Sequence, residues 1–73
     1  MYREKLNEKQ ETIFQKVMLN ALNRRDLLDA HRCKDPEVFV SVSQRLIKEA
    51  SPEIGPADLC WIQFALIESM RDY

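Results

Sequence analysis

Apolar residues recur at three- and four-residue spacing in the first third of the chain, which is the period of an amphipathic α-helix. Asn7 precedes this segment, with Gln10 three positions later. This pair is typical of a capping box, in which the two side chains satisfy backbone N–H groups at the start of a helix. The apolar face of the predicted helix contains Ile13, Phe14, Val17, Met18, Ala21 and Leu22.

Two adjacent arginines interrupt this apolar face. Arg24 and Arg25 fall on the arc that the preceding apolar residues occupy. The helix therefore either bends here or ends and restarts with Asn23 as a new N-cap. The apolar pattern resumes within about one turn. We expect helix over residues 7–32, with a kink or break near Asn23.

The segment CKDPEVF marks the clearest helix start in the chain. Asp35 suits an N-cap, and Pro36 suits the first helical position, where its missing N–H costs nothing. Several β-branched residues follow, and VFVSV on its own resembles a short strand. The caps and the four-residue spacing of the apolar side chains favour a helix over residues 36–50. Its apolar face contains Val38, Phe39, Val42, Leu46 and Ala50.

A third helix is predicted over residues 56–71, after a connection that contains Gly55 and prolines. Its segment LCWIQFALI is almost entirely apolar, but the apolar residues do not form a single stripe. At about 100° per residue, Trp61 and Phe64 point away from the others. The opposite side of the helix contains Leu59, Ile62, Leu66, Ile67 and Met70.

Two interpretations of Trp61 and Phe64 remain open. In the first, the third helix is central and both side chains complete the core. In the second, they pack against another chain. The second interpretation is favoured because a chain of 73 residues has little surface with which to wrap a central helix. Trp and Phe are also typical anchors of protein interfaces.

Composition and charge narrow the class of protein. The chain has 11 Lys and Arg against 12 Asp and Glu, so it lacks the basic excess typical of nucleic-acid-binding proteins. Its 45% apolar and 32% charged residues are typical of a folded helical protein, and we expect one domain over residues 1–73. The apolar segment is about half the ~20 residues that span a bilayer, so no membrane association is expected.

The cysteines and the histidine predict no catalytic or metal chemistry. No secretory leader precedes Cys33 and Cys60, so we expect both as reduced thiols in a cytoplasmic protein. Together with His31 they are too few for a structural zinc site, and no metal or cofactor is expected. Residues two apart on a helix do not face each other, so His31 and Cys33 do not suit a nucleophile pair. We expect neither enzymatic activity nor a small-molecule substrate.

A modest basic cluster lies between residues 24 and 34. Adjacent arginines can bind phosphates or carboxylates. The other interpretation is a solvated surface that nearby aspartates neutralise. The predicted third helix contains no Lys and only Arg71, so it is unsuited to reading a DNA groove as a helix-turn-helix would. The acidic residues close to the cluster are Asp26, Asp29 and Asp35.

The fold class predicted is all-α, with three helices that complete their core by dimerisation. We predict a small non-enzymatic protein–protein interaction module, such as a regulator, adaptor or chaperone-like factor, that binds another protein or forms a homodimer. The alternative is a nucleic-acid-binding regulator that uses basic residues of 24–34. Val40 and Ile47 lie at the edge of the second helix's apolar face and are expected to be exposed in a monomer. The predicted partner-binding residues are Trp61, Phe64, Phe39, Val40 and Ile47, with Arg24, Arg25 and Arg32 at the rim.

Overall fold

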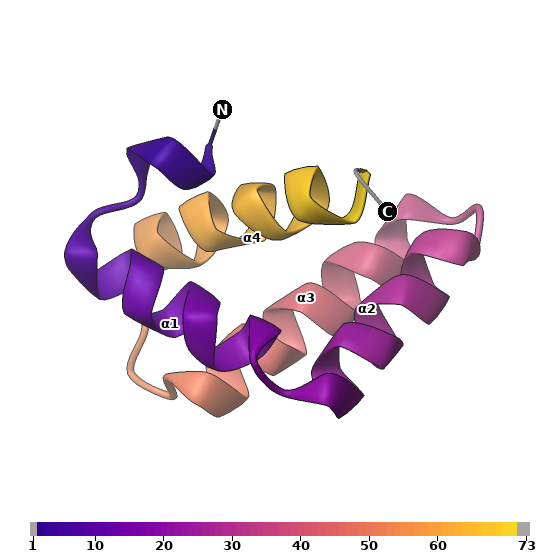
Figure 1. Cartoon of the computed structure of the whole chain (residues 1–73), viewed down its shortest axis with the longest axis horizontal. Helices are drawn as coiled ribbons and strands as arrows, with labels where there is room; N and C mark the ends of the chain where they lie inside the picture. Colours follow the sequence, from indigo (N-terminus) through magenta and orange to yellow (C-terminus); the bar gives the residue numbers. More distant parts are fainter. Residues whose placement is uncertain (1, 72–73) are drawn as a thin grey trace.

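The computed structural model describes residues 2–71, and this part of the chain folds into four α-helices and one short 3₁₀-helix, with no β-strand (Figure 1). The all-α prediction is therefore confirmed for these residues. There are four α-helices instead of three because the first predicted helix is divided in two. The elements are η1 (Arg3–Lys5), α1 (Glu8–Met18), α2 (Ala21–Arg32), α3 (Pro36–Ala50) and α4 (Pro56–Arg71).

The break in the first predicted helix lies at Leu19 and Asn20, a turn before the expected Asn23. Asn20 has extended backbone angles, and its Oδ1 accepts hydrogen bonds from the backbone N–H groups of Leu22, at 2.9 Å, and Asn23, at 3.3 Å. The break changes the direction in which the following side chains point. Leu22 was expected on the apolar face, but it is 69% exposed.

The other predicted helix starts are confirmed. Asn7 accepts a hydrogen bond from the Gln10 backbone N–H, and the Gln10 side chain accepts one from the Asn7 backbone N–H, which completes the capping box. Asp35 accepts from the Glu37 backbone N–H at 3.0 Å and caps α3, with Pro36 as its first residue. The bounds of α3 and α4 match the predicted ranges.

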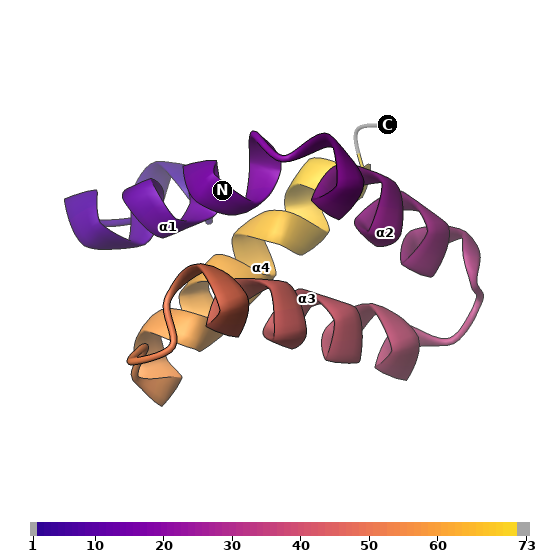
Figure 2. The same cartoon turned by 90° about the horizontal axis from the view of Figure 1, so that it is seen from below.

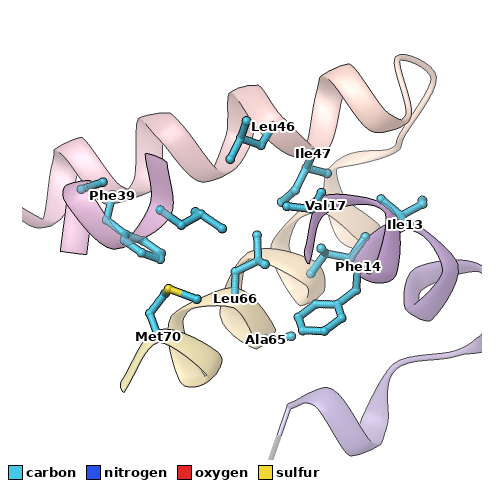
Figure 3. Close-up of a cluster of buried hydrophobic side chains, with 12 residues drawn as sticks. Ile13, Phe14, Val17, Phe39, Leu46, Ile47, Ala65, Leu66 and Met70 are labelled. Carbon is cyan, nitrogen blue, oxygen red and sulfur yellow. The ribbon is translucent and has the colours of Figure 1, made fainter. Parts of the chain in front are cut away.

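Helix α4 contacts α1, α2, α3 and the short helix η1. Figure 2 shows α2 and α3 diverging from the turn that joins them, with α4 passing behind α3. In Figure 3, Phe14 of α1, Ile47 of α3 and Leu66 of α4 point into one cluster. The buried apolar residues are Ile13, Phe14, Val17, Leu27, Ala30, Phe39, Leu46, Ile47, Ile62, Ala65, Leu66 and Met70.

The N-terminal segment packs on α4. The sequence pattern predicts no helix or strand in this segment. The short helix η1 lies over α4 in Figure 1 and contacts it. Arg3 holds this segment to α1, because its guanidinium lies 4.9 Å from the centroid of the Phe14 ring and 3.5 Å from Glu11 Oε1. A cation over an aromatic face and an exposed ion pair each contribute modestly, and together they orient η1.

Candidate interaction surface

Three aromatic side chains gather on the outer side of α4. Trp61 and Phe64 are three residues apart on this helix and therefore lie on the same side of it. The Tyr2 ring stacks on Phe64 with centroids 4.9 Å apart, and it meets Trp61 edge-on at 5.7 Å. The exposed fractions are 41% for Tyr2 and 38% for each of the other two. We call these three residues the aromatic surface.

The aromatic surface contradicts the interpretation in which Trp61 and Phe64 complete the core. Trp61 and Phe64 are neither core residues nor fully uncovered, because Tyr2 covers part of both. The main-chain N–H of Tyr2 donates a hydrogen bond to Glu68 Oε1, which fixes Tyr2 beside the two rings. This arrangement joins residues at opposite ends of the chain, so the local sequence pattern contains no signal for it.

Gln63 and Glu68 are polar residues within the mostly apolar helix α4. Both of them form hydrogen bonds with other parts of the same chain. Gln63 Oε1 accepts a hydrogen bond from Gln44 Nε2 of α3 at 3.3 Å. Glu68 accepts from Tyr2 on the other side of α4. The two polar residues therefore pair on opposite sides of α4 with different elements of the same chain.

Two predicted partner-binding residues are buried within the chain. Ile47 is 0% exposed, so the expectation that it would be left exposed in a monomer is wrong. Phe39 is only 7% exposed and belongs to the same core. The reason is that α3 packs against three helices, α1, α2 and α4. More of the surface of α3 is therefore buried than the single apolar stripe predicted from the sequence. Val40 is half-buried and lines a surface hollow.

The predicted arginines are exposed, but Arg24 and Arg25 do not lie beside the aromatic surface. They line a hollow that also contains Met70 of α4. Met70 is nine residues after Trp61, which at about 100° per residue places it on the opposite side of the helix. Figure 3 shows Met70 pointing toward the core. The structure therefore separates these two arginines from the aromatic residues whose rim they were expected to form.

Two open hollows flank the last turn of α4. The arginine hollow, of about 280 Å³, is lined by Ala21, Arg24, Arg25, Leu28 and Met70. The histidine hollow, of about 340 Å³, lies where the end of α2, the start of α3 and the end of α4 meet. It is lined by Ala30, His31, Cys33, Lys34, Asp35, Pro36, Phe39, Val40, Ile67 and Arg71.

His31 and Cys33 both line the histidine hollow, but no hydrogen bond joins them within the described residues. The His31 ring instead lies edge-on to Phe39, with centroids 6.1 Å apart. Cys33 and Cys60 are both exposed and unbonded thiols. This arrangement does not assemble the nucleophile and base that covalent catalysis requires.

Over residues 2–71, no group of three or more His, Cys, Asp and Glu side chains is placed to hold a metal ion. In the same range, no helix has the length and apolarity needed to cross a bilayer. Comparisons with models of protein families, with curated protein sequences and with solved structures found no significant match.

Proposed function

We propose that this protein is a small non-enzymatic interaction module that acts by burying its aromatic surface against a second copy of itself. The observation that supports the proposal is the aromatic surface: Tyr2 contacts both Trp61 and Phe64, and the three side chains stay 38–41% exposed outside the buried core. Exposed aromatic clusters are typical of interaction sites. A homodimer could serve as a regulator, adaptor or chaperone-like factor.

The chemistry of the aromatic surface suits a partner with the same surface. The face of an aromatic ring is negative and its edge positive, so rings attract one another in stacked and edge-on arrangements. In a two-fold dimer the same patch meets itself, and the Tyr2, Trp61 and Phe64 rings would extend the packing that they already make within one chain. An interface of standard size buries about 800 Å² per partner, a minor part of the 5022 Å² accessible surface.

A cytoplasmic location is part of the same proposal. Cys33 and Cys60 are both exposed, and exposed thiols persist in a reducing compartment, whereas oxidising compartments convert them to disulfides. A Cys33–Cys60 disulfide in protein purified under mildly reducing conditions would contradict this part.

The test is the solution mass of the purified protein, measured by sedimentation over a range of concentrations. We expect twice the 8.6 kDa of one chain for the wild type and dissociation in Trp61→Ala and Phe64→Ala. The matched control is Leu22→Ala, which removes an apolar side chain that is 69% exposed outside the aromatic surface, and it should leave the mass unchanged.

Circular dichroism of the same variants separates dissociation from unfolding. Trp61→Ala and Phe64→Ala are expected to keep the helical content of the wild type, because neither side chain belongs to the buried core. A wild type that stays monomeric at every concentration would overturn self-association. Equal dissociation by Leu22→Ala would show that the aromatic surface is not the interface.

A further inference from the structure

Asp26 lies on a different side of α2 from Arg24, whereas Asp29, four residues after Arg25, lies on the same face as Arg25. Asp26 and Asp29 line a groove between α2 and α3, together with Arg45. Arg24 and Arg25 line the arginine hollow on the side of α4. The aspartates therefore do not neutralise the basic cluster evenly, although the sequence alone would permit this.

The nearby aspartates are engaged elsewhere or unpaired. Asp26 Oδ2 accepts from Arg45 of α3 at 3.3 Å, and Asp35 Oδ1 accepts from the Glu37 backbone N–H at 3.0 Å. Asp29, four residues after Arg25, makes no ion pair within residues 2–71. In the same range, no carboxylate lies within ion-pair distance of the cations near the last turn of α4, which are Arg24, Arg25, Lys34 and Arg71.

Arg24 and Arg25 also lie in the N-terminal half of α2, directly after its first turn. The N-terminus of a helix carries a partial positive charge, which favours anions and disfavours cations. The first turn of α2 contains no acidic residue to offset this charge, and the two arginines follow directly after Asn23. An anion bound at the arginine hollow would pair with both guanidinium groups, while Asn20 already caps the start of the helix.

Each hollow is lined by both cationic and apolar side chains. In the arginine hollow, Ala21, Leu28 and Met70 supply the apolar lining beside Arg24 and Arg25. In the histidine hollow, Pro36, Phe39, Val40 and Ile67 supply apolar lining beside His31, Lys34 and Arg71, and Asp35 is the one acid among the lining residues within 2–71. Volumes of about 280 and 340 Å³ are at or below the small end for a ligand pocket and suit one or two apolar side chains each.

We infer that the two hollows on either side of the last turn of α4 form a docking site for an acidic peptide segment of a partner protein. Its apolar side chains enter the hollows, and its carboxylates pair with Arg24 and Arg25 on one side and with Lys34 and Arg71 on the other. Arginine binds carboxylates in a two-pronged geometry that adds specificity to the charge attraction. This site is separate from the aromatic surface and does not depend on self-association.

A nucleic-acid strand fits these features less well. Strands without sequence preference are bound by cations along a track and by exposed aromatic rings on which bases stack. The exposed rings of Trp61 and Phe64 lie across α4 from Met70 and the arginine hollow, and the chain has a formal net charge of −1. Charge complementarity with apolar anchoring therefore favours a peptide.

The test begins with a phage-displayed library of random 16-residue peptides, selected on the immobilised full chain. We expect enriched peptides to combine Asp or Glu with large apolar residues. A fluorescein-labelled enriched peptide is then titrated with the wild type and variants, with anisotropy as the signal. Arg24→Gln/Arg25→Gln should weaken binding by about tenfold or more, since each charged contact to a partner contributes severalfold.

Two control variants localise the effect. Lys16→Gln/Lys48→Gln removes the same charge from exposed positions on α1 and α3 and should change the affinity less than about twofold, as expected for distant surface charges. Trp61→Ala should also keep the affinity of the wild type, which separates this site from the aromatic surface. Circular dichroism verifies that each variant keeps its helices.

Any of the following results would overturn the inference. The first is no enrichment over an unrelated immobilised protein. The second is enrichment of peptides without acidic residues, or binding that Arg24→Gln/Arg25→Gln leaves intact. The third is tight binding of a 20-nucleotide oligo-dT or of anionic phospholipid vesicles, if this binding depends on Arg24 and Arg25 and the enriched acidic peptides do not compete with it. The hollows would then bind a different class of partner.

Discussion

The Tyr2 ring stacks on the Phe64 ring with their centroids 4.9 Å apart and their planes 25° apart. This contact joins the first described residue to the last helix and gives the aromatic surface its third member. An aromatic pair of this kind contributes about 0.5–1.5 kcal/mol beyond the area it buries. The contact therefore stabilises the N-terminal segment and sets the exposure of Trp61.

Removal of the Tyr2 ring is expected to uncover Trp61. In Tyr2→Ala, Trp61 fluorescence should shift to longer wavelength and become more accessible to acrylamide, because Tyr2 is the ring that covers its edge. Tyr2→Phe is the matched control and should behave as the wild type, since the ring contacts are retained. Unchanged quenching in Tyr2→Ala would contradict the placement of η1 on α4.

A buried amide connects the starts of α1 and α4. Gln10 is 6% exposed, and its Nε2 donates to Asp58 Oδ1 at 2.8 Å while its Oε1 completes the capping box. Gln10→Ala should lower the free energy of unfolding by about 1–3 kcal/mol, because both hydrogen bonds are lost and the half-buried Asp58 carboxylate loses a donor. Urea denaturation measures this change.

Lys9→Ala is the control for that prediction. Lys9 Nζ lies 3.9 Å from Asp58 Oδ2, and its side chain is 69% exposed, so the ion pair is worth about 0.5 kcal/mol or less. A loss in Lys9→Ala as large as that in Gln10→Ala would show that charge, and not the buried amide, joins the two helices.

The junction of α1 and α2 gives a pair of asparagines with opposite expected effects. Asn20→Ala should destabilise the protein by about 1 kcal/mol, because the N-cap of α2 is lost. Asn23→Ala should leave the stability unchanged or raise it by about 0.5 kcal/mol, since alanine is the better helix former inside a helix. Thermal unfolding of both variants checks this, and the reverse order would place the helix start at Asn23.

This junction shows where local sequence patterns are sufficient and where they are not. Asn7 with Gln10, and Asp35 with Pro36, predicted helix starts correctly because capping depends on a few neighbouring residues. Asn20 and Asn23 are both good N-caps, and the sequence pattern alone does not decide between them. The helix start at Asn20 leaves Leu22 69% exposed, although the periodicity places Leu22 on the apolar face.

The candidate surfaces were predictable only in part. Periodicity separated Trp61 and Phe64 from the buried side of α4, because it needs only the geometry of one helix. Tyr2 was missed because the residues it contacts lie some sixty positions away, and Ile47 was misjudged because three neighbours enclose α3. The position of Arg24 and Arg25 relative to Met70 likewise depends on how α2 meets α4.

Ser43 is a buried polar group whose removal should stabilise the protein. Among residues 2–71 its hydroxyl has no hydrogen-bond partner, and the residue is 0% exposed in α3. By contrast, Ser69 donates to the Ala65 carbonyl at 3.0 Å. Ser43→Ala should raise the free energy of unfolding by about 1–3 kcal/mol, because an unsatisfied buried group loses its desolvation penalty. Differential scanning calorimetry gives the change.

Ser41→Ala is the matched control, since Ser41 is exposed on the same helix. It gains only the difference in helix propensity, about 0.5 kcal/mol. The difference between the two variants isolates the unsatisfied hydroxyl. Equal gains would mean that Ser43 is satisfied in solution, for example by a buried water molecule.

The two ends of α2 provide a final prediction, on the cost of the basic cluster. Arg24 lies near the positive end of the helix dipole and Arg32 in its last turn, near the negative end. Arg24→Gln should therefore raise the free energy of unfolding by about 0.3–1 kcal/mol, and Arg32→Gln should lower it by a similar amount. Arg and Gln have similar helix propensities, so the sign of each change reports the charge. Both effects should shrink at 1 M NaCl, where the Debye length is about 3 Å.

A loss of stability in Arg24→Gln at low salt would mean that Arg24 is paired within the folded chain. A gain would show that the chain keeps this cation at the expense of its own stability, as expected of a residue retained for binding a carboxylate.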